Sequence, residues 1–518
     1  MLQESIERFV DHFLKPSSLE ADKAKFVHDP LWGTIEIAPY EQCILDTPLV
    51  QRLRQIHQTG FVYETFPSAR HTRFEHTLGV MHLAGRIATA LKGRYEVVDE
   101  TTVQRVRLAA LLHDTGHSAF SHTTEEIYRW CEDIRPLLEP GGPFSDKGAG
   151  EVISFLIADS KAFRTFYARL KERYPEALKI EIDDFAPLIL SRPARPENQF
   201  EAEIISGPFD ADKLDYFPRD GRSAGIDLTL DIDRLLHCLE LVPSTLQFGP
   251  HAGKETHILV VNRGGFTAIQ QLLFARATLF SSVYHHHKVR ACDCMVKGCF
   301  EYFTDNGKKF KENRVFPGVS LKGAGDFLFL TDADFFAEAN NHDHETPAHQ
   351  AIHNLLYRRL LKRVLSISTQ TLKGLDNPDS KAGYSAFYNL RSNPKELRAL
   401  SEQVLKHAGA DCLKRDVWFD IPSHASFKKA GNAMINMGSR GKTPVLKSLS
   451  EFIPVEKWVE TYDQYYAQSF LFGPPQKEAR IKLARAAIDV LSAEPYKLNL
   501  LDTAIAEDIR DQVTAPKV

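Results

Sequence analysis

The segment LLHDTGHSAFSH at residues 111–122 constrains this 518-residue chain more than any other feature of its sequence. An apolar helix pattern runs into an adjacent imidazole and carboxylate, His113 and Asp114, and a glycine then breaks the helix. Two further histidines, His117 and His122, follow closely. Imidazole nitrogens and carboxylate oxygens suit Fe, Mn, Zn or Mg, and neighbouring residues at a helix end can converge on one ion. The segment therefore indicates a buried helix that ends at a metal site.

A His-Asp pair alone is weak evidence, because the chain contains others at 28–29 and 342–343. Two further positions strengthen it. His76 lies early in an amphipathic helix pattern, where an inward-facing imidazole needs a polar partner. Asp212 lies far downstream in the acidic segment FDADKLDYFPRD. Together these residues form the pattern His, His-Asp, Asp.

Apolar residues recur with a helical period over most of the first 290 positions, most clearly at 78–91 and 103–112. The alternation at 33–37 predicts a small hairpin. The Gly, Pro, Ser and Asp content of 139–150 and 191–198 predicts two surface loops. This part of the chain is therefore expected to be mainly α-helical.

The pattern changes after Pro378, where strand and helix signals mix. We expect a strand near 417–421, mixed elements over 444–469, a last helix near 477–492 and, before this region, a helix over 347–366. The fold is predicted to be mainly α, a helical core with small β hairpins and a smaller α+β C-terminal appendage. The expected parts are an N-terminal helix (1–25), a core (26–305), a linker with a helical extension (306–378) and a C-terminal α+β region (379–518).

Composition excludes several classes of protein. The net charge of −4 provides no general attraction for a polyanion, although a local basic pocket remains possible. Acidic residues interrupt the apolar positions of the N-terminal segment, which therefore lacks the pattern of a secretory signal. No apolar stretch is long enough to span a membrane. Seven unevenly spaced cysteines argue against a disulfide framework, so we expect a cytoplasmic protein without a membrane association.

Several motifs in one order resemble the HD-domain metal-dependent phosphohydrolases, and within them the dGTPase-like deoxynucleoside triphosphate triphosphohydrolases. The motifs are HDPLWG (28–33), DTP with QRLR (46–54), RFEH (73–76), the run at 113–122, DKLDYFPRD (212–220), and Tyr284 with Lys288-Val289. The resemblance is greatest to the mammalian branch that combines a SAM domain with the HD domain, although no SAM domain is expected here. It implies an HD core for 26–305 and a regulatory or oligomerisation role for the C-terminal region.

The resemblance also implies roles for individual residues. The implied ligands of a divalent metal (Fe, Mn, Mg or Zn) are His76, His113, Asp114 and Asp212. The implied catalytic residues are His117, His122 and Glu125, of which the last two share a helix face. The implied phosphate contacts are Arg73, Lys213 and Arg276, and the implied deoxyribose contacts are Gln58, Tyr216, Asp220 and Tyr284. A guanine-nucleotide effector site is implied at Asp46, Gln51 and Arg54.

The chain departs from the family pattern at three places. Thr59 stands where the related enzymes have an apolar residue beside the sugar, so discrimination against ribose is not implied. Phe280 replaces a polar residue on the helix expected over 270–288. The segment 145–151 lacks a histidine element, which would leave Glu125 to orient the catalytic imidazole.

The resemblance implies attack of water at the α-phosphate of a dNTP, which releases a deoxynucleoside and inorganic triphosphate. It also implies activation by GTP or a dNTP, and a homo-oligomer that is a dimer, tetramer or hexamer. Two other functions remain open. The chain could act on nucleic-acid ends, single-stranded nucleic acid or other nucleotides, or it could be a non-catalytic nucleotide sensor.

Several residues also have plain structural interpretations. His117 could cap the turn after the glycine at 116, Arg276 could lie on a solvated helix face, and Asp46 could simply pair with Arg54. The lysine-rich stretch after Asn306 could line a phosphate site or form a solvated surface. A final cluster could bind zinc or pack as small apolar side chains; it comprises His285, His286, His287, Cys292, Cys294 and Cys299.

Overall fold

The computed structural model describes residues 2–14, 19–246, 253–303, 321–340, 346–422, 433–438, 443–455, 457–458 and 468–515. The chain forms two compact units, and each is described by itself. Unit 1 comprises Met1–Arg276, Asp305–Phe335 and Phe427–Val455. Unit 2 comprises Ala277–Thr304, Phe336–Ser426 and Glu456–Val518. The lysine-rich stretch after Asn306 lies largely outside the described residues.

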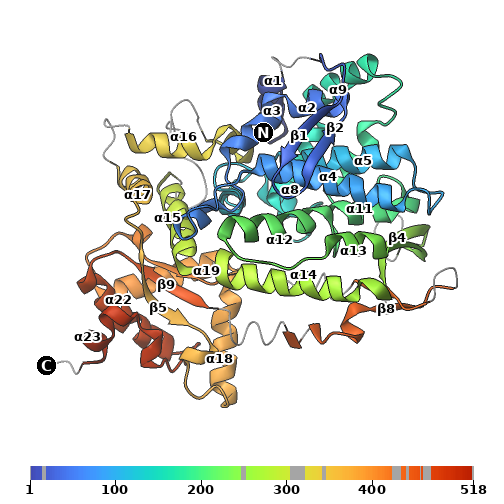
Figure 1. Cartoon of the computed structure of the whole chain (residues 1–518). Coiled ribbons are helices and arrows are strands. Elements are labelled where there is room, and N and C mark those ends of the chain that lie inside the picture. The colour runs from blue at the N-terminus through green and yellow to red at the C-terminus, as the bar shows by residue number, and fades with distance from the viewer. Residues whose placement is uncertain are drawn as a thin grey trace. The chain divides into compact units, whose positions relative to one another are not determined.

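Unit 1 is built mainly from helices (Figure 1). They are α1 (Leu2–Leu14), α2 (Pro39–Leu45), α3 (Pro48–Gln51), α4 (Arg73–Leu91), α5 (Glu100–Leu112), α6 (His122–Tyr128), α7 (Arg135–Leu138), α8 (Ala149–Asp159), α9 (Lys161–Arg173), α10 (Ala186–Ile189), α11 (Gln199–Ile205), α12 (Ala211–Ala224), α13 (Ile232–Cys238) and most of α14 (Phe266–Leu279). The mainly α fold class is therefore confirmed.

Helices α4 and α5 form the centre of unit 1 and pack against each other, and α12 packs on α4. The first turn of α4 is fixed by a capping box between Thr72 and Glu75, and Asp99 caps α5 by accepting a hydrogen bond from the backbone of Thr102. The apolar periods predicted at 78–91 and 103–112 supply the buried faces of these helices. The ends of α4, α5 and α12 carry the side chains of the site described below.

Two small sheets complete unit 1. The predicted hairpin is present as β1 (Lys25–Asp29) paired antiparallel with β2 (Gly33–Ile37). A four-stranded sheet has the order β3-β4-β7-β8. Its strands are β3 (Leu239–Thr245), β4 (Glu255–Asn262), β7 (Met434–Asn436) and β8 (Leu446–Ser448), and β4 pairs with β7 in parallel.

Unit 2 combines helices with one antiparallel sheet of order β5-β9-β6. The strands are β5 (Lys362–Ile367), β6 (Trp418–Asp420) and β9 (Ser469–Gly473). The helices are α15 (His287–Phe303), α17 (Pro347–Leu356), α18 (Pro378–Asn389), α19 (Pro394–Ala408), α22 (Lys477–Ser492) and α23 (Arg510–Thr514), and α16 (Asp332–Ala337) spans the boundary between the units.

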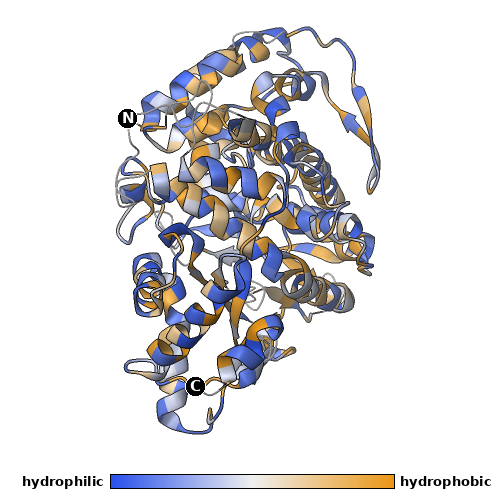
Figure 2. Cartoon of the chain, turned by 90° about the vertical axis from the view of Figure 1, so that its left-hand side faces the viewer, coloured by the Kyte–Doolittle hydropathy of each residue, from blue (hydrophilic) through white to orange (hydrophobic). Residues whose placement is uncertain are grey.

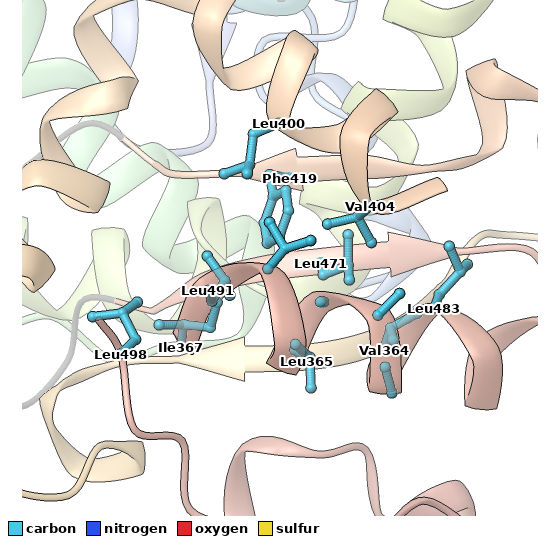
Figure 3. Close-up of a cluster of buried hydrophobic side chains, with 14 of the residues drawn as sticks. Val364, Leu365, Ile367, Leu400, Val404, Phe419, Leu471, Leu483, Leu491 and Leu498 are labelled. Atoms are coloured by element: carbon cyan, nitrogen blue, oxygen red, sulfur yellow. The ribbon is translucent and has the colours of Figure 1, made fainter. Parts of the chain in front are cut away.

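Unit 2 contains a large cluster of buried apolar side chains. All five residues of β9 are buried, which is typical of a strand covered on both faces. Figure 3 shows Leu400 and Val404 of α19 near Phe419 of β6 and Leu471 of β9, and Leu483 and Leu491 of α22 belong to the same cluster. Figure 2 shows how apolar and polar residues alternate along the helices of the chain, as amphipathic packing requires.

The helix predicted over 347–366 is wrong in its second half. Helix α17 ends at Leu356, Arg358 adopts a positive φ of 56°, and Lys362–Ile367 forms strand β5. Residues 364–367 of β5 are all buried. In a surface helix, consecutive residues such as these would point in different directions and some would face solvent. The helix predicted over 270–288 is likewise interrupted, because a π-helical turn at Phe280–Tyr284 separates α14 from α15. No helix among the described residues has the length and apolarity needed to cross a bilayer.

Candidate metal centre

Three of the four predicted metal ligands meet where α4 and α5 pack. His76 lies in the first turn of α4, and His113 and Asp114 follow the last residue of α5. One ligand atom from each of these residues lies within 4.8 Å of the others. Asp212, in the first turn of α12, places Oδ1 3.0 Å from His76 Nε2. The four predicted ligands therefore converge, although they come from three helices.

Hydrogen bonds on the far side of each ring fix how the two imidazoles face the centre. His76 Nδ1 donates to Asp215 Oδ2 at 2.8 Å, and His113 Nδ1 donates to the carbonyl oxygen of Ala110 at 2.6 Å. A neutral imidazole carries one proton, so with that proton on Nδ1 the Nε2 atom offers its lone pair to a cation, on His76 after a bound metal has displaced the second proton that Asp212 and Asp215 stabilise. His113 Nε2 is buried and has no hydrogen-bond partner among the described residues. These donors fit a divalent cation.

The charges at the centre also favour a cation. Burial alone would lower the pKa of His76, but the hydrogen bonds that its ring donates to Asp212 and Asp215, together with the charge of Asp114, raise it to about 10. Burial would raise the pKa of Asp114, but Arg73 and the neighbouring histidines hold it well below its usual value. Carboxylates directed at one buried imidazole leave a negative site that a metal ion would neutralise.

Asp215 holds His76 from the side of the ring that faces away from the centre, and no role was predicted for it from the sequence. Its carboxylate also accepts hydrogen bonds from Trp32 Nε1 at 2.6 Å and from Arg219 Nε at 2.7 Å, and Arg219 Nη1 reaches Asp29 Oδ2 at 2.9 Å. A Cβ on Gly79 would come within 1.8 Å of Asp215 Oδ1, so only glycine leaves room for this carboxylate. Asp215 follows Asp212 by three residues, about one helical turn, and this spacing is the sequence signal that could have identified it as part of the site.

The three predicted catalytic residues form a second group next to the first. Ligand atoms of His117, His122 and Glu125 lie within 4.8 Å of one another. His122 Nδ1 donates to Glu125 Oε2 at 3.0 Å, and Glu125 Oε1 accepts from the backbone of Gly150 at 3.0 Å. Burial would raise the pKa of Glu125, but His122 and His117 lower it, so this carboxylate stays charged.

The loop predicted at 139–150 ends at this second group. A Cβ on Gly150 would lie 2.9 Å from the ring of His117, and one on Gly148 would lie 2.7 Å from Glu125 Oε1. These glycines therefore let the start of α8 approach both side chains closely. The segment that lacks a histidine supplies a backbone N–H group to Glu125 instead.

His117 and Arg73 are both buried and both keep unused hydrogen-bonding atoms. Arg73 Nη1 donates to Asp114 Oδ2 at 2.5 Å and Arg73 Nε donates to Ser121 Oγ at 2.9 Å. Arg73 Nη2 and His117 Nδ1 have no hydrogen-bond partner among the described residues. Burial, and then the charge of Arg73, lowers the pKa of His117 to about 3, so its ring is neutral at physiological pH. Buried polar atoms without partners indicate the place of a ligand.

The other predicted phosphate contacts are engaged within unit 1. Lys213 Nζ donates to the carbonyl oxygen of Gly207 at 2.9 Å and forms an ion pair with Asp210. Arg276 Nη1 donates to Tyr216 Oη at 3.1 Å, which brings two predicted substrate residues together. This hydrogen bond joins Arg276 to Tyr216 on α12, so the side chain of Arg276 is not simply solvated on a helix face.

The predicted sugar contacts are only partly brought together. Asp220 Oδ1 accepts from His71 Nε2 at 2.7 Å, and the backbone N–H of Gln58 donates to the carbonyl oxygen of His71 at 3.0 Å. Gln58 Oε1 is buried without a hydrogen-bond partner among the described residues. Tyr284 belongs to unit 2, so its position is described only within that unit.

Of the predicted effector residues, Asp46 follows the last residue of α2, Gln51 ends α3 and Arg54 lies in the 3₁₀ turn after it. Asp46 is exposed and contacts Lys25 Nζ at 3.4 Å and Gln42 Nε2 at 3.1 Å. Arg54 Nε donates to Gln51 Oε1 at 2.8 Å, and its guanidinium lies 3.5 Å from the centroid of the Phe74 ring. Arg54 therefore pairs with Gln51 rather than with Asp46.

The cysteine and histidine cluster at 285–299 shows no metal-binding geometry in the described part of the chain. Cys292, Cys294 and Cys299 are buried on α15. The groups of ligand atoms that could hold an ion are the two described above, and neither contains a cysteine. The small apolar interpretation of these cysteines is therefore favoured.

Two families match the sequence. The HD domain matches residues 73–207, which contain His76, His113 and Asp114, and a family described as HD associated region matches residues 230–497. A crystal structure of a hypothetical protein from Aquifex aeolicus aligns with a TM-score of 0.59 and 24% identity, over 89% of this chain and 100% of that chain. At that identity the alignment shows a shared fold alone.

Several curated proteins are similar in sequence. An uncharacterized protein from Methanocaldococcus jannaschii is 31% identical over 274 residues, which is 53% of this chain and 48% of that protein. The deoxynucleoside triphosphate triphosphohydrolase SAMHD1 of Gallus gallus is 28% identical over 74% of this chain and 63% of its own length. The SAMHD1 protein of Homo sapiens is 26% identical over 69% and 58%. The chain thus spans about half to three fifths of these relatives.

Proposed function

Because this chain belongs to the HD-domain family that includes the deoxynucleoside triphosphate triphosphohydrolases, we propose that it is a metal-dependent phosphohydrolase that acts on dNTPs. Water attacks the α-phosphorus and the bond from that phosphorus to the 5′ oxygen breaks. The products are a deoxynucleoside and inorganic triphosphate.

One observation carries this proposal. Three buried polar atoms have no hydrogen-bond partner in the part of the chain that the structure describes. They are His113 Nε2, His117 Nδ1 and Arg73 Nη2, and their residues are grouped around Asp114. A metal would use the first, and a phosphate oxygen would use the other two. Leaving such atoms unsatisfied in a folded protein is costly, so a charged ligand that uses all three explains the arrangement.

His76, His113, Asp114 and Asp212 would hold the divalent cation. Such a cation supplies a Lewis acid that neutralises phosphoryl charge and lowers the pKa of a bound water. Asp215 and the carbonyl oxygen of Ala110 keep the two imidazoles in the tautomer that binding requires.

Arg73 and His117 would bind and orient the phosphate. The Arg73 guanidinium is locked between Asp114 and Ser121, so its remaining Nη2 group points in a fixed direction. The neutral His117 ring can form one further hydrogen bond at Nδ1 without adding charge. Fixed donors of this kind stabilise the charge that develops during phosphoryl transfer.

His122 and Glu125 would move the proton. Glu125 accepts a hydrogen bond from His122 Nδ1. The Nε2 atom of this exposed imidazole is therefore available for the attacking water or the leaving 5′ oxygen. Removing the carboxylate should leave the ring free to rotate and so reduce kcat more than it changes KM.

The remaining assignments complete the proposal. Lys213, Tyr216 and Arg276 contact the triphosphate and sugar together with Gln58 and Asp220, and a homo-oligomer forms. A guanine nucleotide at Asp46, Gln51 and Arg54 regulates it; the exposed carboxylate of Asp46 supports this role, since it is accessible for a base.

The test is product analysis with the purified protein. Each dNTP is incubated with Mn²⁺ or Mg²⁺, with and without GTP, and the phosphorus products are separated and identified. We expect inorganic triphosphate and the free deoxynucleoside. Pyrophosphate or monophosphate would contradict the bond that breaks, and turnover of single-stranded DNA without turnover of dNTPs would replace the substrate class.

A further inference from the structure

The loop between α5 and α6, residues 113–121, is held by a segment that follows it far along the chain. We name residues 321–335 the clamp segment. Three consecutive loop residues bond to it: Ser118 Oγ donates to the Phe327 carbonyl oxygen at 2.6 Å, Ala119 N to the Leu330 carbonyl oxygen at 3.3 Å, and Phe120 N to Asp332 Oδ1 at 2.8 Å. The clamp segment and the loop both belong to unit 1.

The end of this loop has an unfavourable backbone conformation. Phe120 has a φ of 58°, and Ser121 has a φ of 53° with a ψ of −116°. A positive φ in a non-glycine residue is unfavourable and persists only where surrounding contacts impose it. His122 is the next residue, so the turn determines where this proposed catalytic imidazole starts α6.

Asp332 is the residue that contacts both sides of this turn. Its Oδ1 accepts from Phe120 N, and its Oδ2 accepts from the backbone of His57 at 3.0 Å and from His57 Nδ1 at 2.5 Å. The carbonyl oxygen of His57 in turn accepts from Ser121 Oγ at 2.6 Å. The Asp332 carboxylate, 4% exposed, thereby joins the turn to the residue before Gln58.

The sequence around Asp332 holds its carboxylate in place. Thr331 and Asp334 cap the start of α16: the backbone N–H of Thr331 donates to Asp334 Oδ2 at 2.9 Å, and that of Asp334 donates to Thr331 Oγ1 at 3.3 Å. The ring of Phe120 stacks on Phe61 at 4.4 Å between centroids and contacts Phe335 edge-on at 4.8 Å. The loop is therefore fixed by packing as well as by hydrogen bonds.

The same network reaches the metal centre. Ser121 Oγ accepts from Arg73 Nε, and Arg73 Nη1 donates to Asp114. We propose that Asp332 is a positioning residue, whose carboxylate holds the Phe120–Ser121 turn and thereby sets His122 and Arg73 for attack at the phosphate. This proposal rests on the proposed function. Asp332 touches none of the proposed ligands, so it acts through the turn alone.

The experiment compares two buried carboxylates of the clamp segment. Asp332→Asn keeps the shape but replaces one acceptor oxygen with an N–H donor that faces Phe120 N–H or His57. Asp326→Asn is the matched control, since Asp326 is equally buried but bonds to Arg8 and to the backbone of Lys322 and Gly323, away from the loop. A loosened turn should misplace His122 by a fraction of an ångström or more, which lowers kcat about 10- to 100-fold.

We expect Asp332→Asn to lower kcat with dNTP while KM and bound metal stay within about twofold of wild type, because the ligands lie on other elements. Asp326→Asn should lower the melting temperature but keep kcat. Equal losses of kcat in both variants, or wild-type kcat in Asp332→Asn, would overturn the proposal.

Two further measurements keep the test decisive. His57→Gln, at a partly exposed position, covers the case in which Asp332→Asn does not fold, and it should lower kcat in the same way. Amide hydrogen exchange reads the turn without any turnover. Exchange at Phe120 should be faster in Asp332→Asn than in Asp326→Asn even if dNTP is not the substrate, so failure of the proposed function is distinguishable from failure of the clamp.

Discussion

The two units bury very different side chains. At the centre of unit 1, Arg73, His76, Asp114 and Asp215 are almost fully enclosed and bond to one another. The cluster in unit 2 contains only apolar side chains, such as Leu365, Phe419, Leu471 and Leu483 around one sheet (Figure 3). Unit 2 also buries charged side chains, but Asp420 pairs with Arg290 and Arg480 pairs with Asp508. The groups of ligand atoms that could hold an ion lie in unit 1 among the described residues, and this difference supports a site in that unit.

The largest expected effect is loss of activity at the metal centre. Asp212→Ala removes a proposed ligand whose side chain is 36% exposed, so the fold should survive. We expect turnover of dNTP to fall by a factor of about a thousand or more, about 4 kcal/mol of lost transition-state stabilisation. Activity assays with elemental analysis of bound metal check this. Asp233→Ala, which removes an exposed carboxylate of the same unit, should change neither.

The second largest effect concerns a buried ion pair of unit 1 that has no proposed role in catalysis. Arg105 Nε and Nη2 donate to both oxygens of Glu201, at 2.9 and 2.7 Å, and both residues are buried. Arg105→Met would leave the carboxylate unpaired and should destabilise the fold by about 3 to 5 kcal/mol. Urea unfolding of the full chain measures it. The double variant with Glu201→Leu should recover most of the loss; no recovery would mean that the pair itself is stabilising.

A matched loss in unit 2 should cost stability alone. Leu471→Ala empties a fully buried position in the central strand β9 and should destabilise by about 2 to 5 kcal/mol. The kcat of the folded protein should not change. Leu413→Ala, at a position that is 48% exposed in the same unit, should stay within about 0.5 kcal/mol of wild type. A drop in kcat for the Leu471 variant would contradict the view that the core of unit 2 contributes to stability alone.

The smallest effect concerns Glu203, a partly buried acid outside the site. Burial raises the pKa of Glu203 to about 7, although the backbone N–H of Leu259 partly offsets it. The folded chain then holds a proton that the unfolded chain has lost between about pH 4.5 and 7. Stability should fall as pH rises through this window, by about 1 to 3 kcal/mol in total.

Glu203→Gln should remove this dependence. Melting temperatures measured at pH 5 and pH 8 should differ less in the variant than in wild type, and the variant should be the more stable at pH 8. The exposed Glu197→Gln serves as the control and should keep the wild-type dependence. An unchanged slope in Glu203→Gln would show that this carboxyl is charged in the folded protein.

The sequence predicted features that local patterns determine. Helix α22 has the predicted bounds, because its apolar residues recur every third or fourth position without interruption. The convergence of His76, His113 and Asp114 was also predicted, since the motif at a helix end is local. The helix predicted over 347–366 is wrong in its second half because a short apolar run fits a helix or a buried strand equally well. Only the pairing of this run with β9 determines that it is a strand.

Long-range partners were not predictable. Asp215 bonds to His76 across 139 positions, and Asp332 bonds to Phe120 across 212 positions. The spacing from Asp212 places Asp215 on the same helix face but does not identify His76 as its partner. The position of Asp332 at the start of α16 likewise does not identify Phe120 as its partner, because a buried aspartate looks like any surface aspartate in a sequence.

The distance between the clamp segment and its loop also affects how the protein is made. The ribosome must add 212 more residues after Phe120 before Asp332 exists. At about 5 to 20 residues per second this takes about 10 to 40 s, during which the nascent loop lacks its restraint. The proposed metal ligands up to Asp212 emerge earlier, so the site for the ion is complete in sequence before the residue that restrains the loop is made. We therefore expect full activity only after most of the polypeptide has left the exit tunnel.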